Sequence, residues 1–115
     1  MTNRKSTDPL VGDELIEVSL QPHHVNLIFS ESMMQLGVPF EISMRGMSAK
    51  EIDPERRSGE LTVLWSLVGK IVKAVIWEEK VSIIFIDGEV LSIGSSRGGP
   101  RGTIMGRHDM TIEDF

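Results

Sequence analysis

The chain has 115 residues, of which 40% are hydrophobic and 25% charged, with no cysteine and a formal net charge of −5 at pH 7. This length predicts one domain, and the lack of cysteine excludes disulfides, thiolate nucleophiles and cysteine-ligated zinc, which favours a reducing, cytoplasmic location. The negative charge argues against a nucleic-acid partner, and no apolar run approaches the roughly 18–20 residues that a membrane span needs.

The N-terminal part of the chain predicts a leader followed by three strands. Residues 1–9 are polar and precede no apolar stretch, so we expect a disordered leader rather than a signal peptide. Alternating apolar residues over 14–20 and 25–29 predict a hairpin with a polar turn between its strands. We expect a loop over 33–37 and the third strand of this part over 38–43.

Residues 54–68 predict one helix. A residue pair suited to a helix start opens the segment, and a glycine follows its end. Its apolar residues recur at helical spacing and form one stripe, which we expect to cover a face of the sheet. The stripe consists of Leu61, Leu64, Trp65 and Val68.

The C-terminal part predicts a three-stranded meander. Alternating residues over 71–77 and 81–86 form two strands around a polar turn. Asp87-Gly88 then predicts a type I′ hairpin turn, because Asp and Gly tolerate positive φ. Residues 89–93 form the third strand.

The two hairpins repeat one pattern. Leu10-Val11-Gly12 recurs as Leu67-Val68-Gly69, and the strand over 25–29 recurs over 81–85 with the same closing Ile-Phe pair. Period-2 patterns often match by chance, but here the opening, the loop length and the closing pair agree together. The sequence therefore predicts an internal duplication.

The predicted fold class is α+β. Two half-repeats, at 10–53 and 67–115, form two pseudo-repeated β-meanders that make one sheet or a partly open barrel, and the helix over 54–68 packs across it. Exposed edge strands favour pairing between chains, so we also expect a homodimer.

The segment 94–102 combines glycines with arginines. Its backbone N–H groups, together with Arg97, Arg101 and the nearby Arg107, could hold a phosphate. The segment lacks the Gly-Lys-Ser/Thr ending of a phosphate-binding loop, so a flexible connection is the alternative interpretation.

Methionines are frequent, with seven in the chain. Adaptable methionine side chains often recognise partners, so Met33, Met34, Met44 and Met47 form a candidate partner surface. The alternative is that they fill the core.

Neither catalysis nor metal binding is indicated. His23, His24 and His108 do not have the spacing of zinc ligands, and no pattern pairs a nucleophile with a base. We therefore expect no enzymatic activity, no metal and no cofactor.

One stretch of the chain carries a resemblance. Leu67-Val68-Gly69-Lys70, a strand, Phe85-Ile86-Asp87-Gly88 and Leu91-Ser92-Ile93 together resemble a group of small bacterial domains of unknown function. The resemblance implies a bacterial binding or interaction module without catalytic residues, and some small domains of this kind look like toxin-neutralising immunity proteins.

The sequence as a whole predicts a small bacterial, cytoplasmic, non-enzymatic protein-interaction module. Its partner would be another protein or a second copy of the chain, and not a membrane or a nucleic acid. The alternative is a small-ligand or phosphate-binding domain that uses the loop over 94–102.

Overall fold

The strands of this chain form two antiparallel sheets. The computed structural model describes residues 10–46, 48–54, 58–59, 62–94, 102–106 and 112–115. Its elements in chain order are β1 Leu15–Leu20, β2 Val25–Phe29, β3 Ser32–Leu36, β4 Phe40–Ser43, β5 Lys50–Asp53, β6 Ser58–Gly59, α1 Thr62–Trp65, β7 Val72–Ile76, β8 Val81–Phe85, β9 Val90–Ile93, β10 Gly102–Gly106 and β11 Ile112–Asp114.

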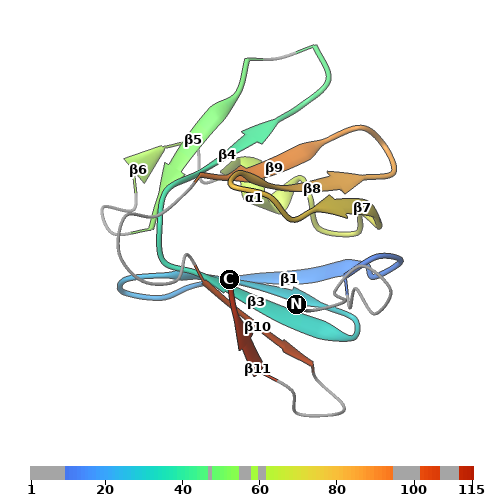
Figure 1. Ribbon diagram of the computed structural model, residues 1–115. Helices are drawn as coiled ribbons and strands as arrows, with labels where there is room; N and C mark the ends of the chain where they lie inside the picture. Colours follow the sequence, from blue (N-terminus) through green and yellow to red (C-terminus); the bar gives the residue numbers. More distant parts are fainter. Residues whose placement is uncertain (1–9, 47, 55–57, 60–61, 95–101, 107–111) are drawn as a thin grey trace.

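The two sheets form two layers around one core. The five-stranded sheet has the order β1-β2-β3-β10-β11, and the six-stranded sheet has the order β6-β5-β4-β9-β8-β7. Figure 1 shows one sheet above the other. Their buried apolar side chains make a single cluster, which includes the fully buried Phe29, Phe40 and Phe85. The described residues contain no helix long and apolar enough to span a membrane.

The period of the sequence gives each strand a buried face. β2, β3 and β8 alternate buried and half-buried residues along their whole length, because successive side chains of a strand point to opposite faces of the sheet. Leu27, Met34 and Ile83 thus face the core. The half-buried residues that alternate with the buried ones, such as Ile28, Met33 and Ile84, lie on the outer faces.

The two predicted hairpins are confirmed. β1 pairs with β2, β7 pairs with β8, and β9 follows beside β8. The turn at Asp87-Gly88 differs from the predicted two-residue type. Gly88 has φ 103° and donates its N–H to the Phe85 oxygen at 2.9 Å, while Phe85 donates to Glu89 at 2.9 Å. These bonds define a three-residue loop that ends in a glycine bulge.

The predicted position of the third strand of the N-terminal part, over 38–43, is wrong. That strand is β3, and it occupies most of the 33–37 segment for which a loop was predicted. Two adjacent methionines hid its alternation, although Met33 points outward and Met34 is fully buried. The segment predicted as this strand, 38–43, contains β4 instead, which lies in the other sheet between β5 and β9.

The helix predicted over 54–68 is confirmed only at Thr62–Trp65, and its predicted length is wrong. α1 has only four residues. Part of the segment before it, Ser58–Gly59, forms β6, which pairs with β5. Glycine is a poor helix former, so this part of the segment gains more from a strand bond than from a helical turn.

The turn that follows α1 explains the failure of the predicted stripe. The N–H groups of Leu67 and Val68 bond to the oxygens three residues back, at 3.1 and 3.2 Å. In a turn of three residues, side chains at i and i+3 lie on the same face. Leu64 and Leu67 are therefore both fully buried, whereas Trp65 and Val68 are 50% and 37% exposed.

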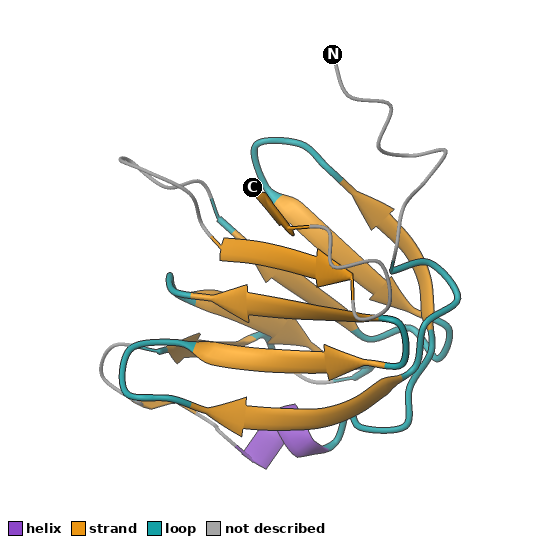
Figure 2. Ribbon diagram, turned by 90° about the horizontal axis from the view of Figure 1, so that it is seen from below, coloured by secondary structure: helices purple, strands orange, loops and turns teal. Residues whose placement is uncertain are grey.

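The fold class is corrected accordingly. The protein is mainly β, with two antiparallel sheets that do not close into a barrel. A four-residue helix is about 6 Å long, which is too short to cover a sheet. Figure 2 shows α1 beside the strands rather than across a layer of them.

The N-terminal and C-terminal segments make reciprocal backbone bonds at positions 57 apart, such as 12 and 69. Gly12 N–H bonds to the Val72 oxygen at 2.9 Å, and Gly69 N–H bonds to the Leu15 oxygen at 2.7 Å. Both glycines have positive φ, 90° and 95°. An antiparallel bridge also joins Glu14 to Ile71, and Ile71 is the counterpart of Glu14 because it lies 57 positions later.

The same correspondence extends into the strands. The β1–β2 register shifts between Leu15 and Glu17, and the β7–β8 register shifts between Val72 and Ala74. Such shifts mark β-bulges, which bend a strand and increase its twist. Both meanders are therefore bent at the same place.

The remaining strands cross between the sheets. β4 and β5 follow the first meander in the chain but extend the second meander at β9. β10 and β11 follow the second meander but extend the first at β3. Each sheet thus combines strands from both parts of the chain.

Candidate interaction surface

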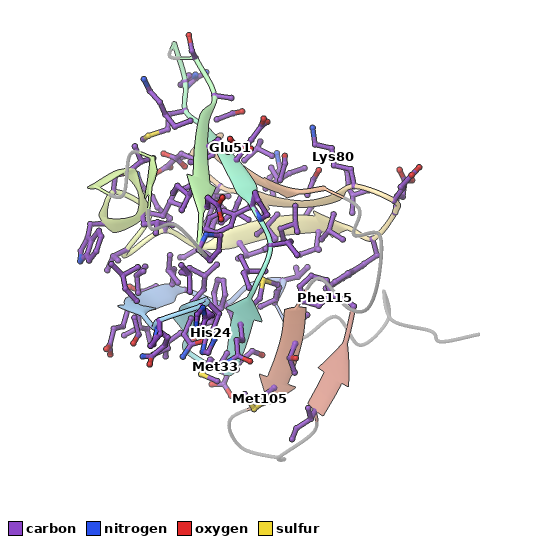
Figure 3. The ribbon with its side chains drawn as sticks, turned by 90° about the vertical axis from the view of Figure 1, so that its left-hand side faces the viewer. His24, Met33, Glu51, Lys80, Met105 and Phe115 are labelled. Carbon is purple, nitrogen blue, oxygen red and sulfur yellow. The ribbon has the colours of Figure 1, made fainter. Side chains whose placement is uncertain are left out.

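The outer face of the five-stranded sheet carries a row of apolar side chains. Ile28 of β2 lies opposite Met33 of β3, Met33 lies opposite Met105 of β10, and Met105 lies opposite Ile112 of β11. Figure 3 shows Met33 and Met105 on neighbouring strands. We call Ile28, Met33, Met105 and Ile112 the apolar row.

The apolar row is continuous across four strands. Directly opposite residues of an antiparallel pair have Cβ atoms about 4.5–5.5 Å apart, so each member of the row is the cross-strand neighbour of the next. Ile112 is 68% exposed, and the other three are half-buried. The solvent face of an antiparallel sheet is ordinarily polar, so this row departs from the usual pattern.

A polar row runs beside the apolar row on the same face. It consists of Ser19, Asn26, Gln35 and Thr103, which are again opposite one another. Gln21 donates from Nε2 to the Ser19 hydroxyl at 2.8 Å. The Asn26 Oδ1 atom is shielded from solvent and has no hydrogen-bond partner. The face therefore combines an apolar strip with amide and hydroxyl groups, as the core and rim of an interface do.

The structure separates the methionines that the sequence grouped together. Met33 lies on the apolar row, but Met34 is fully buried in the core. Met44 is half-buried against the core, and its sulfur accepts a hydrogen bond from the Ser66 hydroxyl at 3.6 Å. Met47 lies outside the described residues.

Sequence reasoning missed three members of the apolar row, namely Ile28, Met105 and Ile112. The signal for Ile28 was present in the alternation of β2, which places it on the face opposite Leu27. Met105 and Ile112 could be linked to Met33 only through the pairing of β10 with β3 and β11. That pairing joins distant parts of the chain.

The predicted anion-binding residues Arg97, Arg101 and Arg107 lie outside the described residues, and anion binding there stays a prediction. His108 lies outside them as well. His23 is exposed in the turn after β1, and His24 accepts the Gln21 N–H at 2.9 Å through its backbone oxygen. Among the described residues, no three His, Asp or Glu side chains are grouped closely enough to hold a metal ion.

An open depression lies on the outer face of the six-stranded sheet. Its volume is about 390 Å³, and its lining includes Glu41, Glu51, Glu79 and Lys80. Figure 3 labels Glu51 and Lys80 at this end of the molecule. Glu41 lies directly opposite Glu51, a like-charge pair that costs stability. This lining is mainly acidic, so it does not suit a phosphate.

Asp13 ties down the turn between β2 and β3. It is only 5% exposed, and its Oδ2 accepts the Glu31 N–H at 3.3 Å. Burial raises the pKa of Asp13 above its ordinary 3.8, and hydrogen bonds from Glu31, Ser30 and Ser32 offset part of that effect. The ionised form of Asp13 is therefore less favourable in the folded protein than in the unfolded chain.

Lys70, the counterpart of Asp13, ties down the matching turn after β8 with the opposite charge. Its Nζ lies 2.7 Å from Asp87 and 3.5 Å from Glu89. The hydrogen bond that Lys70 donates to the Asp87 carboxylate is the main cause that raises the pKa of Lys70. Glu89 is 7% exposed, and its Oε1 has no hydrogen-bond partner. Lys70 is thus the cation that compensates a buried carboxylate.

Comparison with protein-family models, with curated proteins and with solved structures found no match. The resemblance of part of the chain to small bacterial domains, the bacterial origin and the cytoplasmic location therefore stay predictions.

Proposed function

We propose that this chain is a non-enzymatic protein-interaction module that binds its partner through the outer face of the five-stranded sheet. The observation that supports the proposal is the apolar row, which crosses four neighbouring strands. Strands lie about 4.8 Å apart, so the row is about 14 Å long. It is flanked by hydrogen-bonding groups that a partner could engage.

The composition of the row suits recognition better than stability. A methionine side chain is flexible and adapts to the shape of a partner, and methionine is enriched in interfaces. A side chain on the solvent face gains little from folding alone, because it stays partly exposed. Covering it with a partner would gain about 25 cal/mol for each Å² removed from water.

Paired substitutions on the same strands test the proposal. Met33→Lys with Met105→Lys places two charges in the apolar row, and Gln35→Lys with Thr103→Lys places the same charges in the polar row of the same strands. Both variants keep the core residues, so both should fold with similar melting temperatures. The tagged proteins are incubated with lysate of the source cells, and bound proteins are quantified by mass spectrometry.

We expect the wild type and the Gln35/Thr103 variant to enrich one or a few proteins. The amount of these proteins bound to the Met33/Met105 variant should be at least tenfold lower. Equal enrichment by all three, or enrichment by none, would refute the proposed face. Light scattering of the wild type at micromolar concentrations tests whether the partner is a second copy. A monomer mass at every concentration would exclude the homodimer.

We also propose that the two meanders are copies of one ancestral unit. The proposal is supported by the reciprocal bonds of Gly12 and Gly69 and by the matching β-bulges. The expected result is that the two halves of homologous chains align with a single one-residue gap, in the loop between the first two strands of each half, and with Gly at both positions; halves that need further gaps, or that lack either Gly, would contradict the duplication.

A further inference from the structure

Neither part of the chain completes a sheet by itself. Residues 10–53, the N-terminal half, supply β1 to β5, and residues 67–115, the C-terminal half, supply β7 to β11. The edge of β3 is taken by β10, and the edge of β9 is taken by β4. Each half thus donates its last hairpin to the other half and accepts a hairpin in return.

The core depends on the same exchange. In the five-stranded sheet, Met34 of β3 lies opposite Ile104 of β10, and both are buried. In the six-stranded sheet, Ile42 of β4 lies opposite Leu91 of β9, and both are fully buried. Separating the halves would expose apolar residues on both sides, as happens in obligate dimers.

The contacts between the halves follow the rule of a two-fold symmetric dimer. In such a dimer, if residue i contacts residue j of the partner, then j contacts i of the partner. Leu15 N–H bonds to the Lys70 oxygen at 2.9 Å, and Val72 N–H bonds to the Asp13 oxygen at 2.8 Å. Replacing each residue by its counterpart 57 positions away turns the first of these two hydrogen bonds into the second.

We infer that the chain is an intertwined dimer of its two halves, in which each half is the binding partner of the other and the connection between them is not needed to hold the fold. The registers of β3 with β10 and of β9 with β4 determine the exchange. The strand pairs between the halves are regular and bury one face, whereas the described residues of the connection form the two-residue β6 and the four-residue α1, whose Leu64 reaches the core.

Cleavage of the folded full chain tests the inference. A protease recognition sequence is inserted between β6 and α1, and the folded protein is cut there. We expect the two fragments to elute together at the mass of the uncut chain, and their melting temperature to fall on dilution more steeply than that of the uncut chain, because association is then bimolecular. Fragments that separate at micromolar concentration would overturn the inference.

Disulfide formation tests the exchange directly. Gln35 lies opposite Thr103 across β3 and β10, so Gln35→Cys with Thr103→Cys places the thiols within bonding reach. The matched control is Ser92→Cys with Thr103→Cys, because β10 would lie beside β9 if each half kept its own hairpin. The chain has no native cysteine, so no other disulfide competes.

The expected result is at least tenfold more disulfide in the first pair than in the control. In the cut protein, that disulfide holds the two fragments together on a denaturing gel. Preferential disulfide formation in the Ser92/Thr103 control would overturn the inference. The same two pairs are made in the chain without the insertion, where the disulfide yield decides the question even if the insertion prevents folding.

Discussion

Gly102→Ala is expected to destabilise the protein by forcing β10 away from β3. A Cβ at this position would lie well inside 3.0 Å of the Gln35 backbone oxygen, closer than real Cβ contacts. It would also lie 3.1 Å from Phe115 Cζ and 3.2 Å from Leu36 Cδ2. The side chains can move by a few tenths of an ångström, but the oxygen belongs to the paired strand.

The expected cost follows from this geometry. Overpacking of a filled site costs about 1–3 kcal/mol, and the upper half of that range applies because a backbone atom must shift. At this chain length, 1 kcal/mol corresponds to about 4 °C in melting temperature. We therefore expect the Gly102→Ala variant to melt about 8–12 °C below the wild type.

Gly37→Ala is the matched control. A Cβ at Gly37 would meet no atom within 4 Å, so this change should be neutral or stabilise the protein by about 0.4–1 kcal/mol through the unfolded chain. Urea unfolding followed by circular dichroism compares the two variants. The argument would be refuted if Gly102→Ala were as stable as Gly37→Ala.

Three further predictions concern the paired turns. Gly12→Ala and Gly69→Ala should each cost about 1–2 kcal/mol in urea unfolding, because both positions need positive φ; a neutral result at either would contradict the equivalence of the two turns. Asp13→Asn should gain in melting temperature relative to the wild type between pH 4 and pH 7. A raised pKa means that the ionised carboxyl is penalised only in the folded state. Wild-type stability is therefore lost as pH rises from 3.8 through the native pKa. A difference in melting temperature between Asp13→Asn and the wild type that does not change with pH would disprove this. Lys70→Met should lower the melting temperature more than Lys70→Arg does, because only Arg keeps a cation beside the buried Glu89 carboxylate. Adding Glu89→Gln to Lys70→Met should recover part of the loss, because the neutral amide needs no cation. If the double variant recovers nothing, the Lys70–Glu89 pair does not contribute to stability.

The strands with local signals could be predicted from the sequence. β2, β8 and β9 alternate regularly, β1 and β7 alternate apart from one β-bulge each, and turn residues separate these strands. The alternation of a strand and the preference of Asp-Gly for a turn depend on neighbours in the chain. The hairpins therefore followed from local patterns alone.

The wrong predictions for β3 and for the helix show which elements local sequence patterns cannot identify. Met33 and Met34 are both apolar, so period 2 is invisible there, and only the pairing of β3 on both sides makes it a strand. At 62–68, Leu64 and Leu67 could belong to a helical or to a three-residue period. The bonds to the oxygens three residues back show that the chain takes the tighter turn.

The candidate surface was predictable only in part. Met33 was identified as a partner residue, but its neighbour Met105 lies far along the chain, and no local rule connects the two. The exchange of hairpins between halves is a property of register between distant strands. A single sequence does not reveal such a register.

The exchange of hairpins also has a consequence during synthesis. Ile104 follows its partner Met34 by 70 positions (34 to 104), which a ribosome translates in roughly 4–14 s. Throughout that interval the open side of β3 has no strand to pair with, and unpaired edges promote aggregation. The nascent chain therefore has to be shielded, or to fold only after its last strands emerge.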